Sequence, residues 1–202
     1  MRRVMTVLAA AAILYAVFTA SYVAWAQRAP TPGSAMGQPG EAATKYERFV
    51  LKKGTIVVRE FYRLDSLGDG SRGGDWTVLR AYSPGDQSAA LALRIEAAEY
   101  GSSRTRRTGL LDADEVMSLR AALPRMHQML QALPKDAPYT EVEYRGGSVR
   151  VGWFGPERPS FFVQLGHYSD DVLFVQPDRF DQLNELVQKA ATKIDELSKR
   201  RP

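Results

Sequence analysis

Alternation of hydrophobic and polar residues predicts β-strands in several parts of the chain. Between residues 89 and 97, Leu91, Leu93 and Ile95 point to one side and polar or small residues point to the other. This is the pattern of a sheet with one face on a core and one in water. Runs rich in β-branched and aromatic residues predict further strands at 55–64, 76–82, 160–165 and 172–175.

Two more strands, at 140–144 and 148–154, flank the pair Gly146-Gly147. Two glycines between strands are typical of a tight hairpin turn. If the turn is centred on the two glycines, Glu143 lies opposite Arg150, which would add one cross-strand ion pair.

A three- and four-residue spacing of apolar residues predicts two helices. The first covers 112–130 and begins with Asp112 and Glu115 at the spacing of a capping box. Pro124 falls inside it, which predicts a kink or two short helices. The second helix follows Pro177 and carries an unbroken apolar stripe: Phe180, Leu183, Val187, Ala190, Ile194 and Leu197.

These elements predict an α+β domain made of two successive halves, each a set of antiparallel strands followed by a helix. The passage from strand to helix is similar in the two halves, so a duplication and a chance likeness both remain open. The doubled order of elements resembles that of the Whirly and Pur single-strand-binding folds. This resemblance implies a binder of single-stranded nucleic acid. It rests on the order of elements alone, because no motif residue supports it.

The first 26 residues read as an export signal. Arg2 and Arg3 precede an apolar run at 7–20, and Ala24-Trp25-Ala26 has the small residues of a cleavage site. These are the three parts of a secretory signal, which predicts a periplasmic or secreted protein. Residues 4–26 are also long enough for an uncleaved membrane anchor, and a buried helix is the third reading.

Residues 27–44 are rich in proline and glycine and have no apolar period, which predicts a flexible linker. The remaining residues, 45–202, are enough for one domain with its own core. The chain has no cysteine, so disulfides cannot stabilise that core.

The overall charge argues against nucleic acid as the partner. Removal of residues 1–26 takes away two arginines and no acids, which leaves 25 basic against 23 acidic groups. A net charge of +2 is too small to support a phosphate-binding argument.

Few residues suggest chemistry, and the sequence assigns no catalytic residue, metal or cofactor. His167 with Asp170 and Asp171 is a weak metal candidate, because no second histidine or cysteine lies near. A cluster of three arginines is a weak anion candidate, and a solvated loop is the simpler interpretation: Arg104, Arg106 and Arg107.

Aromatic residues on the predicted strands form the candidate binding surface: Trp76, Trp153, Phe154, Phe161 and Phe162. Adjacent strand residues face opposite sides of a sheet, so one of Trp153 and Phe154, and one of Phe161 and Phe162, lies off the core face. That residue is either covered by a helix or part of an exposed patch.

The sequence therefore predicts an exported, non-catalytic module that binds a protein, a peptide or an envelope component through its sheet. Two other functions stay open. One is the single-strand nucleic-acid binder that the element order implies. The other is an extracytoplasmic hydrolase whose carboxylates meet only in the fold.

Overall fold

A computed structural model describes residues 44–67, 74–86, 88–98, 106–155, 160–166, 172–175 and 177–201. These residues belong to one compact unit, Ala43–Pro202. The unit contains two four-stranded antiparallel sheets, each with its strands in sequence order. The predicted α+β class, with strands followed by a helix in each half, is confirmed.

The first sheet consists of β1 (Val58–Leu67), β2 (Gly74–Tyr82), β3 (Ala89–Ala98) and β4 (Arg106–Asp112). The second consists of β5 (Thr140–Gly146), β6 (Val149–Gly155), β7 (Ser160–Leu165) and β8 (Val172–Val175). A short helix, α2 (Lys45–Val50), precedes the first sheet, and α3 (Ala113–Gln131) joins the two. A 3₁₀ turn, η1 (Pro177–Arg179), leads into α4 (Phe180–Ser198).

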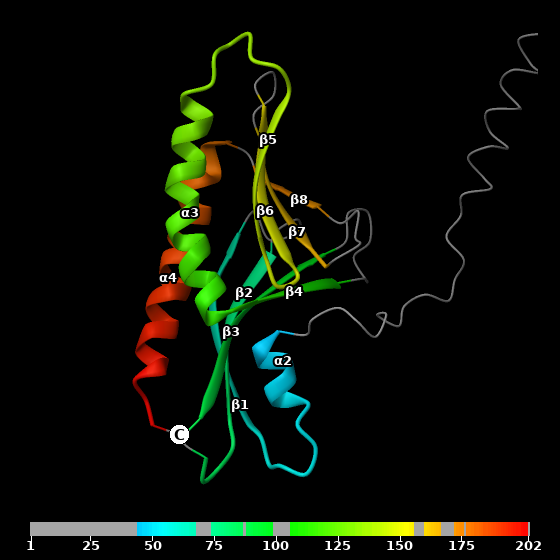
Figure 1. Ribbon diagram of the computed structural model, residues 1–202, viewed down its shortest axis with the longest axis vertical. Coiled ribbons are helices and arrows are strands. Elements are labelled where there is room, and N and C mark those ends of the chain that lie inside the picture. The colour runs from blue at the N-terminus through cyan, green and yellow to red at the C-terminus, as the bar shows by residue number, and fades with distance from the viewer. Residues whose placement is uncertain are drawn as a thin grey trace, which may run out of the picture. The chain divides into compact units, whose positions relative to one another are not determined.

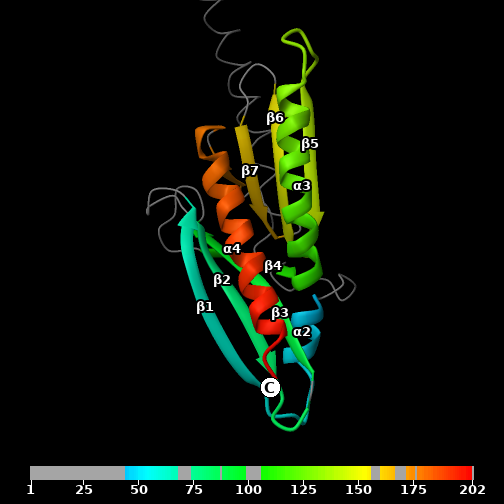
Figure 2. The ribbon, with the colours of Figure 1, turned by 90° about the vertical axis from the view of Figure 1, so that its left-hand side faces the viewer.

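The two long helices lie side by side on the same face of the sheets (Figures 1 and 2). Each contacts the sheet of the other half: α4 crosses β1, β2 and β3, while α3 packs on β5 and β6 as well as on β3 and β4. One continuous core results, with members from both halves such as Trp76, Leu93, Trp153, Leu119 and Leu183. Neither half can therefore bury its apolar face alone.

A second, smaller cluster lies on the opposite face of the first sheet. Tyr46 of α2 packs there against Leu79, Ala81 and Ala92. The first sheet is thus covered on both faces, by α4 on one and in part by α2 on the other (Figure 1).

Two elements of the structure, α2 and β4, are not predicted from the sequence pattern. The helix α2 has six residues, which is too short for an apolar period to be visible. The strand β4 begins with two arginines and contains a glycine, so it shows no alternation. The interpretation of Arg106 and Arg107 as part of a solvated loop is therefore wrong, because both belong to β4.

The register of the β5–β6 hairpin differs from the prediction. Gly147 has the positive φ of the turn, at 47°, and Gly146 pairs with Val149 as a strand residue. Glu143 consequently lies opposite Gly152, and the predicted ion pair with Arg150 forms diagonally. The shift is by two positions, so each side chain stays on its predicted face.

Contacts with the first sheet explain this register. The Ser148 amide donates to Leu110 O over 3.1 Å, and Ser148 Oγ accepts from Leu110 N over 2.8 Å. Ser148 O also accepts from Gly166 N over 2.7 Å. The tip of the hairpin is thus fixed between β4 and the end of β7, contacts that no local turn rule contains.

The helix α3 continues through Pro124, so the alternative of two short helices is wrong. Leu123 and Met126, on either side of the proline, are both buried in the core and hold the helix together. His127, near the end of this helix, is half-buried. Its ring lies 4.2 Å from that of Phe180, because α4 packs against α3.

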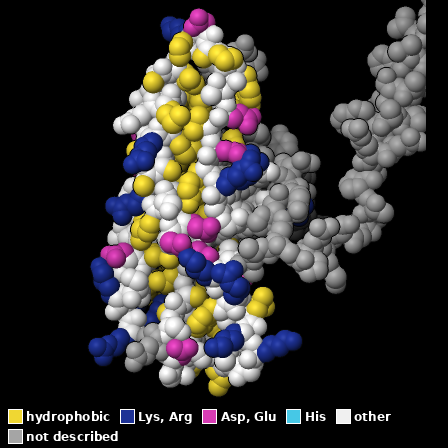
Figure 3. Space-filling view, viewed as in Figure 1, with side chains coloured by type: hydrophobic (Ala, Val, Ile, Leu, Met, Phe, Trp, Pro, Cys, Tyr) yellow, Lys and Arg dark blue, Asp and Glu magenta, His cyan; other side chains and the backbone are white. Residues whose placement is uncertain are grey.

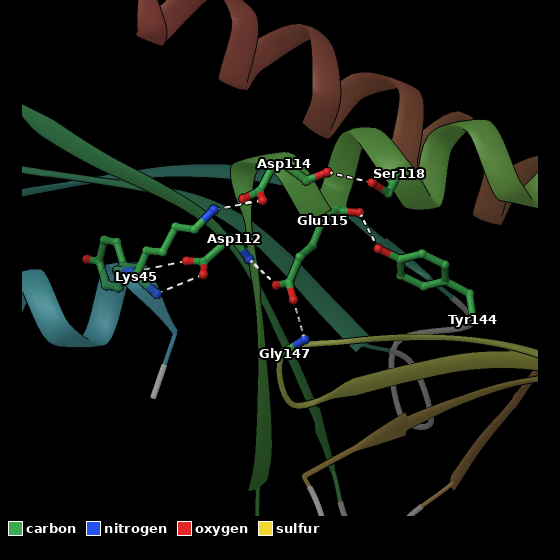
Figure 4. Close-up of polar contacts among 8 residues, drawn as sticks. Lys45, Asp112, Asp114, Glu115, Ser118, Tyr144 and Gly147 are labelled. Atoms are coloured by element: carbon green, nitrogen blue, oxygen red, sulfur yellow. Dashed lines mark hydrogen bonds and ion pairs between the residues drawn. The ribbon is translucent and has the colours of Figure 1, made fainter. Parts of the chain in front are cut away.

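Two carboxylates at the start of α3 connect four elements (Figure 4). Asp112, only 6% exposed, accepts hydrogen bonds from Lys45 N at 2.7 Å and Tyr46 N at 3.1 Å, and thereby holds the first turn of α2. Glu115 accepts from Asp112 N at 2.8 Å and from Gly147 N at 2.7 Å. We call this pair the carboxylate junction.

The junction gives a test with a matched control. Asp112→Ala leaves two amides of α2 without acceptors, and we expect it to lower the free energy of unfolding by about 2–3 kcal/mol. Asp114→Ala removes the same charge but breaks only an exposed pair with Lys45, so we expect little change. Urea denaturation compares the two. Equal losses would contradict the role of Asp112.

The hairpin turn gives a second test. Gly147→Ala places a Cβ 2.2 Å from Leu110 O, at a residue with positive φ. Gly85 also has a positive φ, but a Cβ there would meet no atom within 4 Å. We expect Gly85→Ala to cost about 1–2 kcal/mol from φ alone. Gly147→Ala should cost a further 1–3 kcal/mol, roughly, through overpacking. Thermal unfolding of both variants measures the two losses. Equal losses would contradict the expected close contact at Gly147.

Candidate functional site

The structure separates the five candidate aromatic residues into two groups. Trp76, Trp153 and Phe161 are fully buried on the helix-covered face, where they belong to the core. Phe154 and Phe162 lie on the other face of the second sheet. The expected split of each adjacent pair between two faces is confirmed, and it leaves Phe154 and Phe162 as surface candidates.

Aromatic rings form a row on this outer face. The centroids of Phe154 and Phe162 are 6.3 Å apart with an interplanar angle of 28°, and Tyr139 lies 6.3 Å beyond Phe154. Tyr139 is 69% exposed, Phe154 is partly exposed and Phe162 is buried. We define the aromatic face as these rings with their polar neighbours: Tyr139, Phe154, Phe162, Glu143, Arg150 and Gln164.

A glycine directly opposite Phe162 leaves room for its ring. Gly152 and Phe162 are cross-strand partners, and a Cβ on Gly152 would be 2.3 Å from Phe162 Cζ. The ring therefore lies flat over the Gly152 backbone, as aromatic residues do beside strand glycines. Within the aromatic face Phe162 is thus the buried ring, and Phe154 and Tyr139 are the more exposed ones.

Arg150 fixes the polar end of the aromatic face. Its guanidinium lies 5.8 Å from the Phe162 centroid, a cation–π distance. It donates to Glu143 through Nε at 3.0 Å and through Nη2, and to Gln164 Oε1 at 2.5 Å. These bonds come from the strands on both sides of β6, so the guanidinium is held in one orientation before any ligand arrives.

Glu143 is ionised in this setting. Burial opposes its charge, but hydrogen bonds from Arg150 and Arg145 outweigh that effect and lower the pKa of the carboxyl. Glu143 therefore acts as an anchor for the two arginines rather than as a proton donor.

The weaker candidates do not form a site within the described chain. His167, Asp170, Asp171 and Arg104 lie outside the described residues. Arg106 and Arg107 begin β4, and the Arg107 side chain is exposed. Among the described residues, no group of three metal-ligating side chains is close enough to hold an ion.

The hydrolase hypothesis requires acids from distant parts of the chain to meet in the fold, but the acids at the carboxylate junction, Asp112, Asp114 and Glu115, are neighbours in sequence. All four oxygens of Asp112 and Glu115 accept backbone hydrogen bonds within the fold. Asp114, next to them, bonds Lys45 Nζ at 2.7 Å, which lowers the pKa of its carboxyl despite partial burial. The geometry of the junction is that of a structural connection.

The fold and the aromatic face define a two-sheet α+β module with an aromatic sheet surface. Comparison with protein-family models, curated proteins and solved structures finds no match. In the described part of the chain, none of the helices is both long and apolar enough to cross a membrane.

Sequence analysis predicted the Glu143–Arg150 ion pair as well as Phe154 and Phe162, but it did not place them on one surface, and it missed Gln164 and Tyr139. The signal was present: Glu143, Arg150 and Gln164 occupy the same alternating positions as the two phenylalanines. A correct register places them in neighbouring rows of one face. Since the shift of two positions in the hairpin keeps every side chain on its face, alternation alone already places these residues on one face.

The contact between Gly152 and the Phe162 ring gives a third test, in the form of a double-mutant cycle. Gly152→Ala must displace the Phe162 ring, and we expect a loss of about 1–3 kcal/mol in stability. In the Phe162→Ala background the same change meets no ring, so it should cost much less. Denaturant unfolding of the four proteins measures the difference. Additive losses would show that the ring does not rest on Gly152.

Proposed function

We propose that this protein is an exported, non-catalytic module that binds a peptide segment of another protein through the aromatic face. One observation carries the proposal: an exposed tyrosine and a partly exposed phenylalanine stand beside a pre-oriented arginine on the sheet face away from α3 and α4. Rigid aromatic residues and arginine are the side chains that dominate binding energies at protein interfaces.

The chemistry of the aromatic face suggests what it binds. Tyr139 and Phe154 offer ring surfaces to an apolar or aromatic side chain. The Tyr139 hydroxyl donates to Glu141 over 2.5 Å, which keeps the ring at the edge of the sheet. Three rings and one arginine are a small surface, so the complex is expected to be weak and transient.

Export is the second part of the proposal. It is supported by the basic start, apolar run and small-residue end within residues 1–26. A retained segment at 4–26 would instead anchor the module through the linker at 27–44. We also propose that the repeated order of four strands and a helix reflects an internal duplication.

A second candidate function rests on the outer face of the first sheet. Phe61 is 55% exposed there, and the guanidinium of Arg94 lies 5.6 Å from its ring. Exposed Arg59 and Arg63 flank Phe61 on the same strand face. An aromatic ring among arginines suits stacking with single-stranded nucleic acid. The low net charge of the mature chain counts against it.

A displayed peptide library, panned against the purified full chain, tests the primary proposal. We expect selected peptides to bind Tyr139→Ala and Phe154→Ala at least about tenfold more weakly, because each change removes a ring. Phe61→Ala is the matched control, since it removes an exposed ring from the other sheet and should leave binding unchanged. Affinities from fluorescence anisotropy provide the measurement.

The same proteins separate the two candidate functions. Peptides that bind all variants equally would exclude the aromatic face. Salt-dependent binding of a thymidine oligonucleotide that Phe61→Ala abolishes would favour the nucleic-acid function instead.

A further inference from the structure

The turn between α2 and β1 combines the two most exposed large apolar side chains among the described residues. Leu51 is 72% exposed and Ile56 is 75% exposed. Lys52 and Lys53 lie between them in sequence and are exposed as well. No apolar contact within the described chain accounts for a leucine and an isoleucine in this position.

The segment that carries these residues is basic, with Glu47 and Glu60 just outside it. Residues 48–59 contain four basic side chains and no acid: Arg48, Lys52, Lys53 and Arg59. Within the described residues no acid pairs with Lys52 or Lys53, whereas both lysines of α4, Lys189 and Lys193, have acidic partners. The turn therefore combines two exposed aliphatic side chains with two lysines that have no acidic partner among the described residues.

Other segments at this end of the unit add to the same surface. Ser83 Oγ of the β2–β3 turn donates to Ile56 O over 2.8 Å, and Arg80 Nη2 donates to Arg200 O over 3.0 Å. The C-terminal residues Arg200 and Arg201 therefore lie at the same end (Figure 1). In the space-filling view, several Lys and Arg side chains and an acidic one lie near hydrophobic side chains there (Figure 3).

We propose that this end of the unit docks on an anionic phospholipid surface, with Leu51 and Ile56 entering the headgroup region. Lysines attract anionic headgroups, with a contribution of about 1 kcal/mol each near the surface. Short aliphatic side chains then add apolar contact at the interface. Two aliphatic residues and a few basic ones give weak, reversible binding rather than stable anchoring.

Position in the sequence supports a lipid surface over a protein partner. The turn follows α2, the first described element after the apolar segment at 4–26 and the linker at 27–44. It also lies at the end of the unit away from the end of α3 and from the β5 edge that begins the aromatic face (Figure 1). Docking here would leave the aromatic face accessible, so this inference does not depend on the proposed peptide binding.

The absence of cysteine allows a site-specific test on the full chain. Ile56→Cys and Met129→Cys each introduce one thiol at an exposed position, the second near the far end of α3, and each is labelled with an environment-sensitive fluorophore. The proteins are mixed with phosphatidylcholine vesicles, with or without one quarter phosphatidylglycerol. Any insertion of residues 4–26 is common to both vesicle types.

We expect the label at position 56 to shift to shorter wavelength, and to be quenched by lipid-borne nitroxide, only with the anionic vesicles. The label at position 129 should respond to neither. Adding Lys52→Gln and Lys53→Gln should raise the half-saturating lipid concentration about tenfold or more. Arg120→Gln with Arg125→Gln removes the same charge from the exposed side of α3 and should have little effect.

Several results would overturn the inference. They are an equal response at position 56 to both vesicle types, no response at all, or an equal response at position 129. A shift at position 56 produced by a thymidine oligonucleotide but not by vesicles would assign this surface to nucleic acid instead. Unchanged far-ultraviolet circular dichroism confirms that each labelled chain is folded.

Discussion

The carboxylate junction is the constraint on which the rest of the structure depends. Asp112 ends β4, begins α3 and binds the first amides of α2, and Glu115 binds both Asp112 and the tip of the β5–β6 hairpin. Tyr144 adds a bond from its hydroxyl to Glu115 O at 2.8 Å. Four elements far apart in sequence meet at these few atoms. Because an unpartnered buried carboxylate is costly, the contacts are expected to form together or not at all.

The exchange of helices between the halves explains why the molecule has one core. Since α4 covers the first sheet and α3 reaches the second, the interior is shared and no boundary through it separates two domains. The same arrangement leaves each sheet one outer face. On the first sheet α2 covers part of that face, while on the second sheet the outer face carries Phe154, Phe162 and Arg150. The candidate binding surface thus follows from which helix covers which sheet.

Much of this fold could be predicted from sequence, because elements with one buried face have a regular spacing of apolar residues. The stripe of α4 from Phe180 to Leu197 is buried throughout, and β7 has its predicted bounds. The failures have a common cause in long-range contacts. The register of the hairpin is set by Ser148 pairing with Leu110, and β4 is a strand because it pairs with β3. Arg150 lies beside Phe162 because β6 pairs with β7 with Arg150 opposite Gln164 and Gly152 opposite Phe162, a register that alternation alone does not give.

Helix exchange also bears on how the chain acquires its structure. The face of β1 and β2 that carries Trp76 and Val78 receives its cover from residues near the C-terminus, with Arg80 bonded to Arg200 O. A growing chain would have to keep this surface uncovered until the residues of α4 became available. Contacts of such long sequence separation slow folding. If the chain is exported as proposed, late closure is an advantage, because an unfinished core keeps the chain unfolded during transport.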